Sequence, residues 1–258
     1  MKKVIFLGGK KVGYLCLEAL IQHPGIHVLQ AISNCSDLYD ASDRWYPCIR
    51  ELAEKNNLPY KATNKINASD MIQKIRKLAP DIIFVAYYDQ ILSPSLFSIP
   101  KEGAVNLHLA DAEKYRGCYP TVYAIINGEK EYGVTLHYID EGVDTGYIID
   151  KVTFPLLSTW TGKDLYEVAT LEGVKLFERN LDAFVRGKVK ARPQASAVGV
   201  KQYRRKQFPS HEISFSEDPE RIYNKIRSLL FPPFPPPYFM IGEKKIVIQE
   251  YKQYDTSG

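Results

Sequence analysis

The chain has 258 residues, of which 45% are hydrophobic and 25% charged, as expected for a soluble globular protein with a sizeable core. Its formal net charge of +4 suits a small anionic ligand better than nucleic acid, which needs a concentrated basic face. The four cysteines form no C-x-x-C pair and match no zinc pattern, and the opening apolar run is short. We therefore expect a cytoplasmic protein with reduced thiols, no metal, no nucleic-acid partner and no membrane attachment.

Apolar runs alternate with helical patterns over the first three-fifths of the chain. The runs predict strands at residues 4–7, 27–33, 81–88, 104–108 and 132–139. Helical spacing predicts helices at residues 12–21, 46–55, 69–78, 122–126 and 161–186. Ser69 is expected to cap its helix, and Gly173 to interrupt the last one. Short strands separated by helices indicate a Rossmann-like α/β fold, with a mostly parallel sheet covered by helices on both faces.

The sequence changes character near Gly187, so we predict one domain over residues 1–190 and a small α+β appendage over residues 191–258. In the appendage, residues 219–230 predict a helix and 245–250 a strand, and the basic residues 201–206 most simply form a solvated face. Residues 231–239 read FPPFPPPYF. Because aromatic residues interleave these prolines, a packed brace is favoured over an SH3-type ligand. Such a tail could also carry a homodimer interface.

A glycine-rich turn at residues 8–13 links the first strand to its helix, where α/β folds bind phosphates. Tyr14 stands where a P-loop needs lysine, and Lys10 breaks the G-x-G-x-x-G pattern. Two readings stay open: a tight turn that needs small residues, or a site where Lys10 or Lys11 binds a ligand phosphate.

Asn106 and His108 form the centre of the predicted site. Alternation places both on one face of their strand, at the carboxyl end where open parallel sheets bind ligands. The glycine-bracketed loop at residues 140–146 follows another strand, and Asp144 within it reaches His108 if the two strands are neighbours. A packed strand histidine is the alternative reading.

These three residue types suit acyl transfer to an amine. The Asn106 amide can donate to the acyl oxygen as negative charge grows there. His108 can take the proton that the attacking nitrogen loses. Asp144 would orient the imidazole and favour its charged form.

Several motifs resemble the folate-dependent formyltransferases: Asn106-Leu107-His108, Tyr115-Arg116-Gly117, residues 133–137 and residues 140–146. The resemblance covers roughly residues 1–190. It implies N10-formyltetrahydrofolate as co-substrate and Asn106, His108 and Asp144 as catalytic residues. It also implies a pterin site, held largely by backbone groups, at Tyr87, Tyr88, Gln90, Ile91, Leu92, Ile139 and Asp140.

Three groups of that family differ in the amine they use. The tail argues against the glycinamide ribonucleotide enzymes, and it is short for the basic barrel of the methionyl-tRNA formyltransferases. The pattern at residues 226–235 resembles the enzymes that act on nucleotide-linked amino sugars. Residues 109–113 depart from the Ser-Leu-Leu-Pro segment of the other two groups. We therefore expect a dTDP-linked amino-dideoxy sugar, destined for a surface polysaccharide such as the O-antigen of lipopolysaccharide.

Arg44 and Trp45 lie in a long predicted loop. An arginine can bind a pyrophosphate bidentately, and a tryptophan can stack on a sugar or base. With Lys10 they are the candidate substrate-binding residues, although an ordinary surface loop with a buried tryptophan is an equal alternative. A methionyl-tRNA formyltransferase and a non-catalytic folate- or nucleotide-binding module remain alternative functions.

Overall fold

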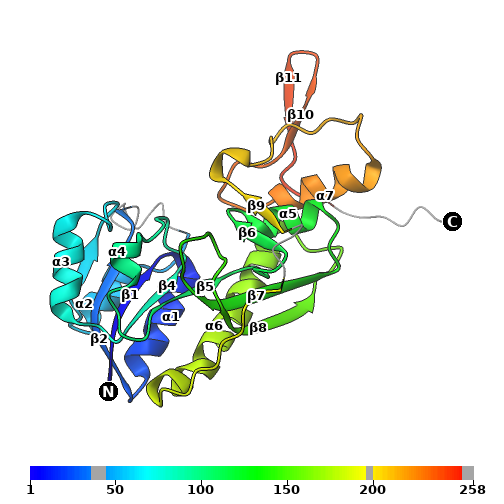
Figure 1. Ribbon diagram of the computed structural model, residues 1–258. Helices are drawn as coiled ribbons and strands as arrows, with labels where there is room; N and C mark the ends of the chain where they lie inside the picture. The colour runs from blue at the N-terminus through cyan, green and yellow to red at the C-terminus, as the bar shows by residue number, and fades with distance from the viewer. Residues whose placement is uncertain (36–44, 196–199, 252–258) are drawn as a thin grey trace.

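The computed structural model describes residues 1–35, 45–195 and 200–251. A seven-stranded sheet forms its centre, with strand order β3-β2-β1-β4-β5-β7-β8 (Figure 1). The first five in this order run parallel, and β7 and β8 are antiparallel to their neighbours. The strands are β1 (Lys2–Gly8), β2 (Ile26–Ser33), β3 (Tyr60–Ala62), β4 (Ile82–Ala86), β5 (Ala104–His108), β7 (Glu131–Tyr138) and β8 (Ile148–Pro155). The Rossmann-like prediction is confirmed, and the unpredicted β8 extends the sheet.

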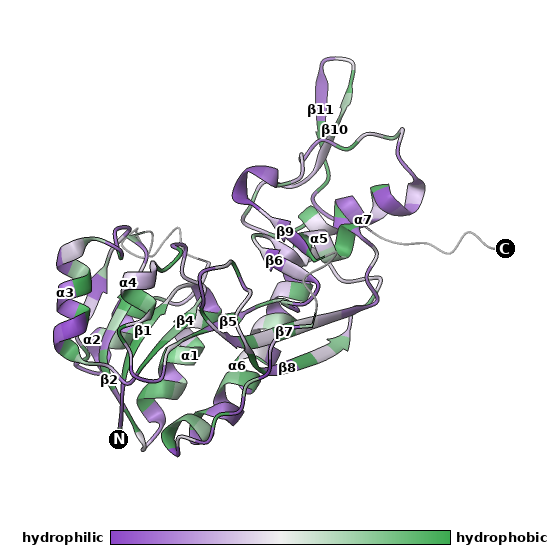
Figure 2. Ribbon diagram, viewed as in Figure 1, coloured by the Kyte–Doolittle hydropathy of each residue, from purple (hydrophilic) through white to green (hydrophobic). Residues whose placement is uncertain are grey.

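Helices cover both faces of this sheet because its central strands are apolar on both sides (Figure 2). In β1, Phe6 faces the core with α1 (Lys10–Gln22), α2 (Ile49–Lys55) and α6 (Gly162–Val185). The adjacent Ile5 faces the core with α3 (Ser69–Leu78) and α4 (Pro94–Phe97). Strand alternation thus supplies two cores from one sheet.

Two details of the helix predictions are wrong. Ala68, not Ser69, is the N-cap of α3, and Ser69 is already its first helical residue. Helix α6 passes Gly173 without a break. A Cβ on Gly173 would lie 2.9 Å from Leu109 Cδ2, so this glycine allows the helix to approach the sheet closely. Thr161 begins α6 with a capping box to Asp164.

The C-terminal part packs on the middle of the chain. Strand β9 (Lys201–Tyr203) pairs in parallel with β6 (Tyr115–Gly117), and the 3₁₀ helix η3 (Arg205–Gln207) follows. Helix α7 (Pro219–Leu229) lies against α5 (Pro120–Ile126). The hairpin of β10 (Tyr238–Ile241) and β11 (Lys244–Val247) projects away from the body (Figure 1). The domain boundary near residue 190 stays a prediction.

Candidate active site

The antiparallel pair of β5 and β7 brings polar side chains together at the carboxyl end of β5. Asn106 and His137 are direct partners in the register, and Asn106 Nδ2 lies 3.3 Å from His137 Nε2. The loop after β7 adds Asp144, whose Oδ1 lies 3.3 Å from Asn106 Nδ2 and 3.4 Å from His137 Nε2. The structure therefore places Asn106, His108 and Asp144 in one polar cluster, which we call the Asp144 cluster together with His137.

A backbone contact orients the buried imidazole of His108. The Tyr115 carbonyl oxygen lies 3.0 Å from His108 Nε2, and a carbonyl can only accept, so Nε2 carries the hydrogen. This leaves Nδ1, 3.7 Å from Asp144 Oδ2, as the nitrogen that gains or loses a proton. By the same argument the Tyr138 carbonyl, 2.8 Å from His137 Nδ1, leaves His137 Nε2 to face Asn106.

Asp144 accepts from the N–H groups of Asn106 and Gly117 and lies beside two imidazoles. Burial alone raises the pKa of its carboxyl group, but His108, His137 and the Gly117 N–H together lower this pKa below its usual range. The Gly117 N–H donates to Asp144 Oδ2 at 2.8 Å. Asp144 is therefore ionised at neutral pH, and its negative charge lies beside both imidazoles.

The loop that carries Asp144 has an unusual backbone. Asp144 adopts a left-handed conformation with φ of 54°. Two residues later the chain crosses β7 so closely that a Cβ on Gly146 would lie 1.8 Å from the Tyr138 carbonyl oxygen. Only glycine fits there, which explains the Asp-Thr-Gly end of the loop.

Two further members of this cluster, His137 and the Gly117 backbone, are not predicted from the sequence. His137 is 2% exposed and lies on the strand face opposite to Leu136, which enters the core. Its position opposite Asn106 depends on the strand register, so residue patterns alone could not reveal it.

The predicted pterin segment follows β4. Tyr88 and Gln90 turn toward the loop before α3: Tyr88 Oη donates to the Thr63 carbonyl at 2.9 Å, and Gln90 Nε2 to the same oxygen at 3.0 Å. Leu92 is buried in the core, whereas Ile91 is 70% exposed. Two side chains thus fix the backbone of this segment, and Ile91 faces outward.

The other end of the predicted pterin site is the junction of β7 and the Asp144 loop. The Ile139 N–H donates to the Ala104 carbonyl at 2.8 Å. Asp140 closes the loop, because its Oδ1 accepts from the Gly142 N–H at 3.1 Å and from Thr145 Oγ1 at 2.5 Å.

Lys10, in the glycine-rich turn, lies near Trp45, and Arg44 falls outside the described residues. The Lys10 ammonium lies 3.9 Å from the Tyr46 ring centroid and 5.7 Å from that of Trp45. Lys11 is turned away and pairs with Glu167 on α6. A Cβ on Gly13 would lie 3.0 Å from the Ala86 carbonyl oxygen, so the turn needs small residues for packing.

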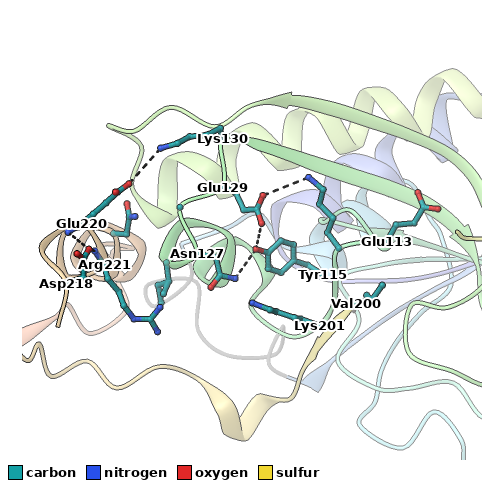
Figure 3. Close-up of a pocket in the computed structure, with 14 residues that line it drawn as sticks. Glu113, Tyr115, Asn127, Glu129, Lys130, Val200, Lys201, Asp218, Glu220 and Arg221 are labelled. Carbon is teal, nitrogen blue, oxygen red and sulfur yellow. Dashed lines mark hydrogen bonds and ion pairs between the residues drawn. The ribbon is translucent and has the colours of Figure 1, made fainter. Parts of the chain in front are cut away.

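A separate cleft of about 810 Å³ lies between α5, α7 and the β6–β9 pair (Figure 3). Several of its polar groups contact one another: Tyr115 Oη donates to Glu129 at 2.7 Å, and the Lys130 and Glu220 side chains lie 3.9 Å apart. The Asp144 cluster instead brings two imidazoles beside a buried carboxylate and an amide, and it is the candidate active site.

The described residues contain no group of three or more His, Cys, Asp or Glu that could hold a metal ion. In the same ranges, no helix is both long enough and apolar enough to cross a membrane.

An amide, an imidazole and a carboxylate at the strand ends of a Rossmann-like sheet define an enzyme of group transfer by acid–base chemistry. Residues 2–181 match the formyl transferase family, and the chain belongs to this family. It is 32% identical over 99% of its length to the bifunctional polymyxin resistance protein ArnA of Wigglesworthia glossinidia brevipalpis, of which it spans 39%. It is 31% identical over 100% of its length to the methionyl-tRNA formyltransferase of Clostridium acetobutylicum, spanning 82% of that protein.

Among solved structures, the fold is similar to the N-formyltransferase of Helicobacter canadensis in complex with folinic acid and dTDP-3-aminofucose. The TM-score is 0.78 at 26% identity, over 99% of this chain and 91% of that one. The predicted family, most like the sugar N-formyltransferases, is thereby confirmed.

Proposed function

We propose that this protein transfers the formyl group of N10-formyltetrahydrofolate to the amine of a dTDP-linked amino-dideoxy sugar. The observation that carries the proposal is the similarity to the Helicobacter canadensis N-formyltransferase, which includes the C-terminal part and whose structure contains a folate and a dTDP-amino sugar. The alternative functions differ in what this part of the chain must bind.

The packing of the C-terminal part supports a small acceptor. Arg227 is buried on α7, and its Nη1 donates to the Trp160 carbonyl at 2.8 Å. Phe231 and Phe234, which begin the proline-rich segment, pack edge-on against Trp45 with ring centroids 5.2 and 5.7 Å apart. The tail thus builds a wall beside Lys10 and Trp45, instead of a separate module for a large partner.

The Asp144 cluster fits a formyl folate, because it presents an amide donor and a base at the end of β5, and the neighbouring strand β4 leads into the segment where Ile91 is exposed. The co-substrate supplies the formyl group. Asn106 donates to the formyl oxygen as its charge grows, an effect typically worth roughly 3 kcal/mol. Its present contacts at 3.3 Å are long and readily exchanged. As the amine nitrogen bonds to the formyl carbon, His108 Nδ1 takes its proton, and ionised Asp144 stabilises the resulting imidazolium. The imidazolium returns this proton to N10 of the folate as the bond between N10 and the formyl carbon breaks.

For the pterin we propose the backbone of Tyr87, Tyr88, Gln90, Ile91 and Leu92, together with Ile139 and Asp140. The hydrogen bonds of Tyr88 and Gln90 to Thr63 hold this segment in place without the ligand, and such preorganisation lowers the entropic cost of binding. For the sugar nucleotide we propose Lys10 and Arg44 at the pyrophosphate and Trp45 at the sugar or base.

Methionyl-tRNA formylation is the second candidate, favoured by the identity to the Clostridium acetobutylicum enzyme. Initial rates with initiator methionyl-tRNA and with a panel of dTDP-amino sugars, at equal concentration and physiological salt, separate the two. We expect a one-formyl mass gain on a sugar nucleotide. Faster formylation of the tRNA would overturn the acceptor assignment, and no transfer to any amine would favour a non-catalytic binding module.

The product of the proposed reaction would enter a surface polysaccharide such as the O-antigen of lipopolysaccharide. We place the reaction in the cytoplasm, in agreement with the free thiols of Cys16, Cys35, Cys48 and Cys118. We further propose a homodimer, because the hairpin of β10 and β11 carries exposed apolar side chains and an isolated two-stranded hairpin is marginally stable in water.

A further inference from the structure

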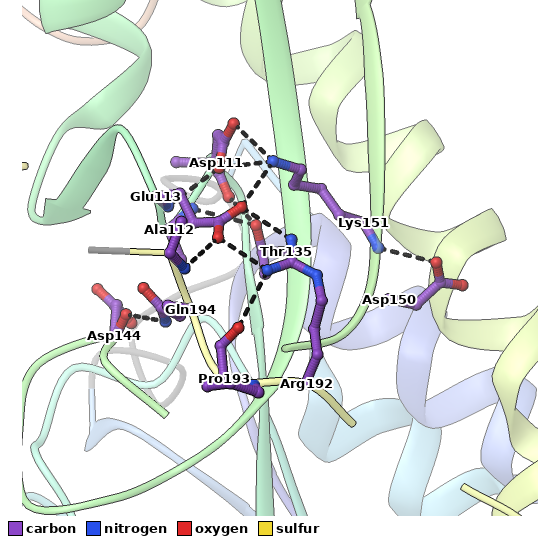
Figure 4. A network of polar contacts seen from close by, with 12 residues as sticks. Asp111, Ala112, Glu113, Thr135, Asp144, Asp150, Lys151, Arg192, Pro193 and Gln194 are labelled. Carbon is purple, nitrogen blue, oxygen red and sulfur yellow. Dashed lines mark hydrogen bonds and ion pairs between the residues drawn. The ribbon is translucent and has the colours of Figure 1, made fainter. Parts of the chain in front are cut away.

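The segment at residues 192–195, which follows α6, crosses back to the Asp144 loop (Figure 4). The Gln194 amide lies between this loop and Arg116. Its Nε2 donates to the backbone carbonyls of Asp144 at 2.8 Å and Gly146 at 2.9 Å. Its Oε1 accepts from Arg116 Nη2 at 2.6 Å. One side-chain amide thus uses both of its donors and its acceptor.

These contacts hold a backbone that is costly to form. A residue with a Cβ seldom adopts the left-handed conformation without support from its surroundings, and Asp144 has φ of 54°. Arg116, which is 8% exposed, immediately precedes Gly117, whose N–H binds the Asp144 carboxylate. Gln194 therefore ties together the two chain segments on either side of that hydrogen bond.

Glu113 binds residues on both sides of Gln194 in the chain. Arg192 binds the Glu113 carboxylate in a bidentate pair, with both distances 2.9 Å, and the Ala195 N–H donates to Oε1 at 2.7 Å. The Lys151 ammonium also donates to the Glu113 carboxylate, at 3.0 Å. The Arg192 guanidinium, against the opposing effect of burial, lowers the pKa of Glu113 well below its usual range.

Glu113 belongs to residues 109–113, which differ from the Ser-Leu-Leu-Pro segment expected in the methionyl-tRNA and glycinamide ribonucleotide enzymes. Asp111 in the same turn also binds Lys151, at 3.1 Å. The acidic residues of this segment therefore form ion pairs that hold residues 192–195 beside the candidate active site.

We propose that Gln194 is a positioning residue that fixes the Asp144 carboxylate opposite His108. The inference rests on the proposed catalytic role of Asp144. An amide is required, because a carboxylate at this position would accept from Arg116 but could donate to neither carbonyl. Loss of the two donated bonds frees the Asp144 loop, so kcat falls while the KM for each substrate changes little.

The test uses the full chain with Gln194→Glu and Gln194→Met, which both keep the side-chain length. Gln73→Glu makes the same chemical change at an exposed position of α3, away from this network, and serves as the control. Hydrogen exchange of the Gly117 amide, measured by NMR without substrates, reports the position of Asp144 directly. Steady-state kinetics with formyl folate and a dTDP-amino sugar report its consequence, and thermal unfolding reports the fold.

In both Gln194 variants we expect Gly117 exchange to be about 10-fold faster and kcat to be at least about 10-fold lower, as for the loss of two hydrogen bonds. We expect Gln194→Glu to keep its Tm, because its pairing with Arg116 becomes stronger. Unchanged Gly117 exchange, or faster exchange with unchanged kcat, would overturn the proposal. Faster exchange in a protein whose wild type transfers no formyl group would support the positioning role and overturn the proposed function instead.

Discussion

The strand ends of the central sheet and the hairpin of the C-terminal part place their side chains in opposite ways. At the strand ends, His108 and His137 are 8% and 2% exposed, and each ring is held by a backbone carbonyl. In the hairpin, Ile241 and Val247 are 61% and 44% exposed, and β11 is exposed along its whole length.

This difference in burial distinguishes a region suited to catalysis from a region suited to contact with another surface. Burying polar groups is costly unless each is paired, so a buried group of polar side chains marks a place where chemistry depends on geometry. An exposed apolar strand marks contact with another surface. Substitutions at the strand ends should therefore change the rate of the reaction, and substitutions near the tail should change affinity or assembly.

The largest effect is expected from the base. His108→Ala should lower kcat by a factor on the order of 10²–10⁴ while formyl-folate binding stays nearly intact. Single-turnover kinetics and a folate titration measure both quantities. His27→Ala, at an exposed position of β2, is the matched control. Near-normal turnover without the imidazole would remove His108 from the mechanism.

Asp144→Asn should have a smaller effect and should also change the pH dependence. Wild-type activity should rise from acid toward mildly basic pH, since the attacking amine must be neutral. The substitution replaces an ionised carboxylate with a neutral amide beside the proposed base, so the kcat/KM profile should change in shape as well as in height. If the variant and the wild type have superimposable profiles, the two residues are not electrostatically coupled.

Trp45→Ala should act on affinity for the acceptor. Because Trp45 packs with Phe231 and Phe234, its loss opens the wall beside Lys10. The KM for the sugar nucleotide should rise about 10-fold, and that for the folate should stay within about two-fold. Phe215→Ala, at an exposed aromatic of the tail, controls for general loss of aromatic surface. An equal rise in both KM values would place Trp45 outside the acceptor site.

A fall in pH should destabilise the packing around Asp144 and Glu113 before it affects the exposed hairpin. Asp144 and Glu113 have pKa values below their usual range. Such groups stabilise the fold above their unfolded pKa of about 4, and the stabilisation is lost as pH falls through the lower folded-state pKa. Urea denaturation should give a free energy of unfolding that declines below about pH 4.5. Glu113→Gln should flatten this decline, and an unchanged slope would contradict the assignment.

The smallest effect on catalysis is expected in the hairpin. Ile246→Lys places a charge on its exposed apolar side and should shift a homodimer toward monomers in analytical ultracentrifugation. The kcat should remain within about two-fold of wild type, because the hairpin projects away from the Asp144 cluster. Lys244→Glu, on the same strand, is the control. A wild type that sediments as a monomer would refute the proposed homodimer.

Much of the catalytic half follows from local sequence. Alternating apolar residues placed β5 and β7 correctly, because side chains at i and i+2 share a face whatever the rest of the fold does. The same alternation put Asn106 beside His108, and the glycines around Asp144 indicated a tight loop. Strand β8 escaped prediction because most of its residues are only partly buried and leave no clear alternation.

Tertiary structure alone decided which distant residues meet. His137 joins Asn106 through the antiparallel register of β5 and β7, and Gln194 reaches Asp144 from a segment 50 residues further along the chain. In the sequence, Asp111 and Glu113 are only part of a segment that differs from Ser-Leu-Leu-Pro. The structure shows that Asp111 pairs with Lys151 and Glu113 with Arg192. Sequence periodicity reports the face on which a side chain lies, whereas its partners depend on strand order, register and chain crossings, which are set by packing of the whole molecule.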